Sequence, residues 1–191
     1  MFLKWVSGLV MEQRYYLKKI NSNKTVNFFS LENDINLVNW VIQNIKINNE
    51  INPQFSELKR YQLDNIEYLH CEKNNINLYI ILGDALESIK LIRKLTKIKF
   101  NFIFQDAFSP KNNPQFWDKR WFNHLNEISS DNAILGTYSC SKGVLRSLVQ
   151  AKWYIASSIG YGKKRSITIA NKINNNDPEL YKNILRSINP I

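Results

Sequence analysis

Short apolar runs alternate with helical patterns along most of this 191-residue chain. The apolar runs that predict strands are Thr25–Leu31, Ile76–Leu82, Phe100–Phe104 and Ala133–Ser139. The helical patterns between and after them cover residues 37–45, 85–95, 117–128 and 142–151. Strands that alternate with helices of about ten residues form a parallel sheet with helices on both faces. This pattern therefore predicts an α/β fold with a mostly parallel sheet.

The end of the chain departs from this alternation. Two further strands, Tyr154–Ser157 and Ser166–Ala170, are joined by a short turn in place of a helix, which predicts an antiparallel pair at one edge of the sheet. The tail beyond Asn171 is polar, with a short helix predicted over Pro178–Ile188. Residues 48–72 are the least regular part, and we expect a helix from Phe55 to Tyr68 that packs as an insertion over a sheet edge.

The composition excludes several classes of protein. A hydrophobic content of 44% allows a sizeable core and excludes a disordered chain. No apolar run approaches the roughly 20 residues that span a bilayer, and no signal peptide is evident at the first residues. The two cysteines, Cys71 and Cys140, give neither a disulfide framework nor a zinc pattern. We expect free thiols, no metal and a cytoplasmic protein.

The net charge of +10 points towards a nucleic-acid partner. A second explanation stays open, because the chain is rich in Asn, Ile and Lys together, a bias that an AT-rich genome imposes on any protein. The tightest basic cluster is Gly160–Arg165, which includes Lys163 and Lys164.

One stretch combines a buried strand with a polar loop. The apolar run Phe100–Phe104 is followed by Asp106, by two prolines at Pro110 and Pro114, and then by Trp117. A strand that delivers one carboxylate into an aromatic-flanked loop is typical of a site at the carboxyl end of a parallel sheet. The alternative is an ordinary strand, N-cap and turn.

Acids follow two other predicted strands, at Glu32 and at Asp84, which comes after Gly83. An acid at the end of the second strand is placed to accept the hydroxyl hydrogens of a ribose, and Asp84 is placed to bind the amine of an adenine. Asp106 is then nearest the reacting centre. For each acid the alternative is a helix cap or a solvated turn.

The longest motif, Phe102–Trp117, resembles the MnmC-like methyltransferase family, in which a strand leads into Asp-Ala/Gly-Phe-Ala/Ser-Pro, a Lys or Asn pair, Pro and Trp. The resemblance covers roughly residues 14–172, and its further motifs are Phe28–Glu32, Leu135–Ser141, Val144–Leu148 and Gly160–Lys164. It implies a Rossmann-like class I methyltransferase domain over residues 1–172 that uses S-adenosylmethionine (SAM), with a polar tail at 173–191.

In this family the methyl group goes to the aminomethyl group of a modified wobble uridine in tRNA, which gives 5-methylaminomethyl-2-thiouridine. Some members are fused to an FAD-dependent oxidase, and this chain resembles the stand-alone form. Two other functions stay open: a catalytically silent RNA-binding relative, and a methyltransferase for another amine.

The resemblance also implies roles for individual residues. Asp106 is the expected catalytic carboxylate, which holds the substrate ammonium and accepts its proton. Aromatic residues stack on the extruded base and lysines hold tRNA phosphates. The expected cofactor-binding residues are Gly8, Glu32, Gly83, Asp84 and Asp106, and the expected substrate-binding residues are Phe108, Pro110, Lys111, Trp117, Tyr138, Lys163 and Lys164, with Arg165 beside them. Core packing is the alternative for the aromatic residues and is favoured for Phe116 and Phe122, whereas a solvated turn is the alternative for the basic ones.

The cofactor loop of the family is rich in glycine, and the corresponding stretch here, Lys4–Met11, retains only Gly8. We therefore expect the first strand and the glycine loop to be degraded or missing, as in an N-terminally truncated chain. A relative that has lost cofactor binding is the second interpretation. The first is favoured because the downstream motifs are intact.

Overall fold

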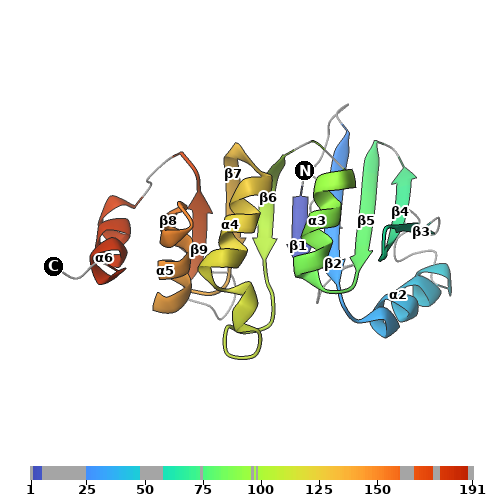
Figure 1. Cartoon of the computed structure of the whole chain (residues 1–191), viewed down its shortest axis with the longest axis horizontal. Coiled ribbons are helices and arrows are strands. Elements are labelled where there is room, and N and C mark those ends of the chain that lie inside the picture. The colour runs from blue at the N-terminus through green and yellow to red at the C-terminus, as the bar shows by residue number, and fades with distance from the viewer. Residues whose placement is uncertain are drawn as a thin grey trace. The chain divides into compact units, whose positions relative to one another are not determined.

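The computed structural model describes residues 2–5, 25–47, 58–73, 75–95, 97, 99–159, 166–173 and 177–188. The chain divides into two compact units, Met1–Lys97 (unit 1) and Ile98–Ile191 (unit 2). In Figure 1 each unit consists of a sheet with helices packed on it.

Unit 1 carries a mixed sheet in the strand order β3-β4-β5-β2-β1. Strands β1, β2 and β5 are parallel to one another, whereas β4 is antiparallel to β5 and β3 is antiparallel to β4. Its elements are β1 (Phe2–Trp5), β2 (Val26–Glu32), α2 (Ile35–Ile47), β3 (Lys59–Leu63), β4 (Ile66–Lys73), β5 (Ile76–Leu82) and α3 (Ala85–Leu95).

The apolar side chains of unit 1 alternate along its strands, as the period of two requires. Phe28, Leu78 and Leu69 occupy one face and form a buried cluster with Val38 of α2. Their neighbours in sequence, among them Leu31 and Ile81, point to the opposite face, which α3 covers in Figure 1. Each fully buried Leu or Ile contributes about 2 kcal/mol, so both faces stabilise the sheet.

Unit 2 carries a second mixed sheet in the order β6-β7-β9-β8. Strands β6 and β7 are parallel, and β9 runs antiparallel to both β7 and β8. Its elements are β6 (Phe100–Gln105), the 3-10 helix η1 (Pro114–Phe116), α4 (Lys119–Ile128), β7 (Ser129–Thr137), α5 (Lys142–Gln150), β8 (Tyr154–Ile159), β9 (Ser166–Asn171) and α6 (Pro178–Ile188).

Large aromatic residues form the centre of unit 2. Trp121, Phe122, Trp153 and Phe100 are fully buried. The Trp153 indole Nε1 donates to the Phe122 carbonyl oxygen over 3.1 Å, so this buried polar group is satisfied. Helix α5 packs against α4, α6 and β8, which holds the C-terminal helix on the unit.

The structure confirms most of the predicted elements, including the antiparallel final pair and the helix over Pro178–Ile188. The burial of Phe116 and Phe122, predicted as core packing, is also confirmed. None of the helices in the described part is both long and apolar enough to cross a bilayer.

Three predictions about the sheet are wrong. The described part of the predicted helix Phe55–Tyr68 is the hairpin β3–β4. A mostly parallel sheet is also wrong, because the described pairings are three parallel and four antiparallel. The first strand, predicted as degraded or missing, is not missing, since the four-residue β1 pairs in parallel with β2 from Phe2 to Trp5, whereas the predicted glycine loop beyond Trp5 lies outside the described residues. Strand β4 pairs with the edge of β5, and β1 pairs with the edge of β2, so the backbone groups of both edges form hydrogen bonds. Such long-range pairing outweighs local sequence preference.

Candidate active site

The carboxyl ends of β2 and β5 lie side by side in unit 1 and carry three of the predicted cofactor-binding residues. The two strands are parallel with Glu32 opposite Leu82. The Gly83 amide donates to the Glu32 carbonyl oxygen over 2.8 Å, which joins the two strand ends. Gly83 has a φ of +115°, a conformation that a side chain would strain. The structure therefore brings Glu32, Gly83 and Asp84 to one edge of this sheet.

The two carboxylate oxygens of Glu32 have different environments. Its side chain is buried, and Oε1 accepts from the amides of Asn33 and Asp34 at 2.9 and 3.0 Å. Oε2 is also buried but has no hydrogen-bond partner among the described residues. Burial raises the pKa of this carboxyl above its ordinary value of 4.5, and the two backbone bonds oppose that rise. A buried acceptor oxygen without a partner fits a ribose hydroxyl.

Asp84 caps the helix that follows it. Its Oδ1 accepts from the amides of Leu86 and Glu87 at 2.8 and 3.3 Å, at the start of α3. The residue is exposed, and its second oxygen has no hydrogen-bond partner among the described residues. The capping alternative is thus realised for Asp84, and it leaves one oxygen for a ligand.

In unit 2, Asp106 and Tyr138 come directly after the parallel strands β6 and β7, whose last residues, Gln105 and Thr137, are paired. Both side chains are half-buried. The Tyr138 ring meets Phe104 edge to face with centroids 5.5 Å apart. The structure therefore places the predicted catalytic acid and one predicted stacking residue at the same edge of this sheet.

Residues 106–118 form a loop that the side chain of Gln105 stabilises through hydrogen bonds. The Gln105 side chain is fully buried, and its Nε2 donates to the Phe116 carbonyl oxygen over 2.9 Å. Its Oε1 accepts from the Trp121 indole Nε1 over 3.0 Å. Gln105 and Trp121 were not among the predicted site residues, although a polar residue at the end of an apolar strand is the signal that identifies Gln105.

The two predicted stacking residues of the 106–118 loop have different environments. Trp117 is buried, and its Nε1 donates to the Phe108 carbonyl oxygen over 2.7 Å. The Phe108 side chain is 65% exposed. The structure therefore gives Trp117 a role in closing the loop and leaves the Phe108 ring accessible to a base.

Some of the remaining predicted residues lie in this loop, and the others lie outside the described ranges. Pro110 is half-buried and Lys111 is exposed, within the turn whose Asn112 and Asn113 amides donate to the Ser109 carbonyl oxygen. Gly8, Lys163, Lys164 and Arg165 lie outside the described residues. Within the described ranges, no three His, Cys, Asp or Glu side chains are grouped so that they could hold a metal ion.

Known proteins resemble this chain in both sequence and fold. A family model described as S-adenosyl-L-methionine-dependent methyltransferase matches residues 46–173. An uncharacterised protein of Methanocaldococcus jannaschii is 37% identical over 113 residues, which are 59% of this chain and 30% of that protein. The tRNA 5-methylaminomethyl-2-thiouridine biosynthesis bifunctional protein MnmC of Pseudomonas paraeruginosa is 33% identical over 92 residues, 48% of this chain and 14% of that protein. The chain thus spans less than a third of the length of these curated relatives.

A solved structure extends the resemblance over most of the chain. The crystal structure of MnmC2 from Aquifex aeolicus superposes with a TM-score of 0.65 and 22% identity, over 90% of this chain and 53% of that one. At this level of identity the superposition supports the fold alone.

Proposed function

Because the chain belongs to the S-adenosylmethionine-dependent methyltransferase family that contains the methyltransferase domain of MnmC, we propose that it methylates the aminomethyl group of a modified wobble uridine in tRNA. The observation that supports this most is the family match over residues 46–173, because that stretch includes Asp84 and the whole 106–118 loop. The name of the MnmC relative, which refers to the biosynthesis of 5-methylaminomethyl-2-thiouridine in tRNA, suggests the class of substrate.

The cofactor-binding residues in this proposal belong to unit 1. Glu32 Oε2 accepts hydrogen bonds from the ribose hydroxyls, since it is buried without a partner among the described residues. The free oxygen of Asp84 accepts from the adenine amine, while its other oxygen keeps the cap on α3. When bound, S-adenosylmethionine would supply a methyl group on a positively charged sulfur. An amine nitrogen can attack that methyl carbon and displace the sulfur.

The acceptor residues belong to unit 2. A primary alkylamine is mostly protonated at neutral pH and is then not a nucleophile. The Asp106 carboxylate holds this ammonium through charge-assisted hydrogen bonds and accepts one proton, which frees the nitrogen lone pair. Attack of this nitrogen on the methyl carbon would form the nitrogen–carbon bond as the sulfur–carbon bond breaks. The sulfur would leave as a neutral thioether, and the product would be a secondary ammonium with two protons on nitrogen.

The 106–118 loop positions the base in this mechanism. An anticodon base must leave its stack to enter a site, and an exposed aromatic ring replaces the lost stacking. Phe108 offers such a ring, and its backbone is held by Trp117. Stacking on one ring contributes about 1–3 kcal/mol, enough to fix the orientation of the base.

The proposal is tested by methyl transfer from labelled S-adenosylmethionine to two forms of one tRNA. One form carries 5-aminomethyl-2-thiouridine at the wobble position and the other carries unmodified uridine there. We expect label only in the first form, recovered as the methylaminomethyl nucleoside after digestion. Equal labelling of both forms, or labelling of small amines and of neither tRNA, would contradict the proposal. Binding of tRNA without any transfer would favour a silent RNA-binding relative.

A further inference from the structure

The net positive charge is larger in the unit that carries the 106–118 loop. Residues 98–191 contain thirteen Lys and Arg against six Asp and Glu, whereas residues 1–97 contain thirteen against ten. Lys and Arg are thus divided evenly, and the difference comes from the smaller number of acids in unit 2. The cations of unit 2 therefore have fewer acids with which to pair.

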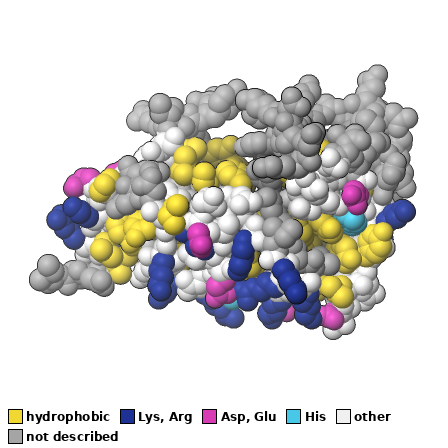
Figure 2. Space-filling view, turned by 90° about the horizontal axis from the view of Figure 1, so that it is seen from above, with side chains coloured by type: hydrophobic (Ala, Val, Ile, Leu, Met, Phe, Trp, Pro, Cys, Tyr) yellow, Lys and Arg dark blue, Asp and Glu magenta, His cyan; other side chains and the backbone are white. Residues whose placement is uncertain are grey.

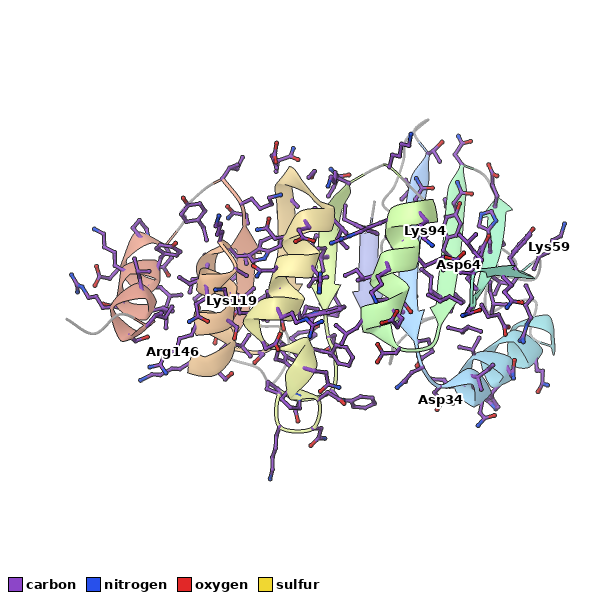
Figure 3. All side chains as sticks on the ribbon, in the orientation of Figure 1. Asp34, Lys59, Asp64, Lys94, Lys119 and Arg146 are labelled. Atoms are coloured by element: carbon purple, nitrogen blue, oxygen red, sulfur yellow. The ribbon has the colours of Figure 1, made fainter. Side chains whose placement is uncertain are left out.

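Several exposed cations in unit 1 pair with neighbouring acids. Lys90 pairs with Glu87 at 2.8 Å, and Lys94 pairs with Asp64. Figure 2 shows basic and acidic side chains next to one another at several places on the face it draws. Figure 3 labels both members of the second pair, Lys94 of α3 and Asp64.

Four cations in unit 2, which we call the edge cations, differ from these. Their side chains are exposed and make no ion pair with any residue in the described ranges. They follow the carboxyl ends of β6 and β7, which the parallel pairing of these strands places at one edge. The edge cations are Lys111 in the 106–118 loop, Lys119 and Arg120 in the first turn of α4, and Lys142 in the first turn of α5.

Three of the edge cations, Lys119, Arg120 and Lys142, oppose the electrostatic preference of the helices that carry them. A helix N-terminus carries partial positive charge, so a cation there costs about 0.3–1 kcal/mol. The first turns of α4 and α5 contain no acid. Helices α3 and α6 show the favourable order, with Glu87 or Glu179 in the first turn and basic residues in the last. The unfavourable placement occurs where the chain also exposes Phe108.

Neighbouring acids and hydrogen bonds do not account for the edge cations. Asp118 lies beside Lys119, but its Oδ1 accepts from the Trp121 amide over 2.8 Å as the cap of α4. Arg146, further along α5 and labelled in Figure 3, is different, because its Nε donates to Ser187 of α6 over 3.0 Å. Arg146 thus joins two helices, whereas the edge cations are exposed and have no ion-pair partner among the described residues.

We propose that the edge cations bind the phosphates of the tRNA strand on either side of the nucleotide that enters the site. This inference rests on the proposed function and names the surface that holds its substrate. Exposed cations at the sheet edge that also carries the exposed Phe108 ring match a single-stranded nucleic acid, because the ring takes a base and the cations take the flanking phosphates. An acidic peptide would use the charges and leave the ring without a partner.

The test compares two triple variants that remove the same charge from unit 2. The edge variant is Lys119→Gln, Arg120→Gln and Lys142→Gln. The control variant is Lys152→Gln, Lys182→Gln and Arg186→Gln, all exposed residues away from the first turns of α4 and α5. Lys111 is kept so that the 106–118 loop is unchanged. Affinity for unmodified tRNA is measured by fluorescence anisotropy without cofactor, across a range of salt concentrations.

We expect the edge variant to bind tRNA at least about tenfold more weakly, and the plot of log affinity against log salt to flatten by about 2 units, since each lost phosphate contact removes about 0.7–0.9. The control variant should stay within about twofold of the wild type. Equal weakening by both variants, or no weakening by the edge variant, would overturn the inference.

Methyl transfer separates this inference from the proposed function. If the wild type binds tRNA through the edge cations but transfers no methyl group, the proposed function fails and the surface stands. If the wild type transfers methyl and the edge variant keeps the wild-type KM for tRNA, the surface fails and the function stands. When both hold, the edge variant loses far more in kcat/KM than in kcat, because tRNA binding is what it impairs.

Discussion

Glu32 combines a backbone-bonding oxygen with a buried oxygen that has no partner among the described residues. The apolar run Thr25–Leu31 predicted that this acid follows a strand, because the end of such a run can be recognised from sequence. The unequal use of its two oxygens was not predictable, since it depends on how the backbone turns at Asn33 and Asp34. The environments of Phe108 and Trp117 were not predictable either. Both are aromatic residues of one loop, but Phe108 is 65% exposed and Trp117 is buried.

Glu32→Gln tests the proposed use of that oxygen through stability and binding together. The pKa of Glu32 in the folded chain is raised above 4.5, so the unfolded chain loses this proton first as the pH rises. Stability therefore falls from about pH 4.5 up through the folded-state pKa and stays reduced above it. We expect the Glu32→Gln variant to lack this fall, and so to unfold at higher urea concentration than the wild type at neutral pH.

The same variant should bind S-adenosylmethionine at least about tenfold more weakly, because a charged acceptor is lost. Urea titrations at about pH 5 and about pH 8, with calorimetric titration of the cofactor, provide the measurements. Glu72→Gln, at an exposed position of β4, is the control and should change neither quantity. A Glu32→Gln variant that is less stable at neutral pH and binds cofactor normally would contradict this role.

At the scale of elements, the 106–118 loop is fixed by side chains from its two ends. Gln105 ends β6 and bonds Phe116 and Trp121, and Trp117 bonds the backbone of Phe108. The sequence indicated a loop with an acid at its start. It did not indicate this network, because hydrogen bonds between residues eleven to sixteen positions apart leave no local periodicity.

Gln105→Leu should loosen this loop. The substitution removes two buried hydrogen bonds of about 1 kcal/mol each and leaves polar groups poorly satisfied, so we expect a loss of about 2–4 kcal/mol in the free energy of unfolding. Methyl transfer should fall as well, because a mobile loop no longer positions Asp106 and Phe108. Asn101→Ala on the same strand is the control. Its amide bonds the Ser130 hydroxyl over 3.1 Å at an exposed site, and its loss should cost under about 1 kcal/mol. Equal losses for the two variants would show that the network does not stabilise the loop.

The hairpin β3–β4 is the element that sequence patterns misplaced. Leu58, Tyr61 and Tyr68 recur at intervals that also suit a helix. The turn at Asp64 and Asn65 carries the missed signal, since Asp64 has a φ of +53°, which Asp tolerates better than most residues. Pairing of Tyr68 with Ile81 of β5 then decides the structure, and a local window cannot show that contact.

At the scale of the whole molecule, composition suggested a nucleic-acid partner without locating it. The net charge of +10 has two explanations in sequence alone. The structure adds that cations without an ion pair among the described residues follow β6 and the adjacent strand β7, and Asp106 also follows β6. Part of the charge therefore lies at the sheet edge that carries the candidate catalytic acid. Family membership over residues 46–173 supplies the methyl-donor chemistry that neither charge nor fold specifies.

The most direct measurement is single-turnover methyl transfer to tRNA that carries 5-aminomethyl-2-thiouridine, with Asp106→Asn compared to Asp131→Asn. Asp131 is the matched control because its side chain is 98% exposed and only approaches Lys172 at 3.8 Å. Asparagine cannot accept the proton, so we predict a fall of about 100-fold or more for Asp106→Asn, partly restored at higher pH where the amine deprotonates unaided. The control should keep the wild-type rate, and an Asp106→Asn variant that also kept it would contradict the proposed mechanism.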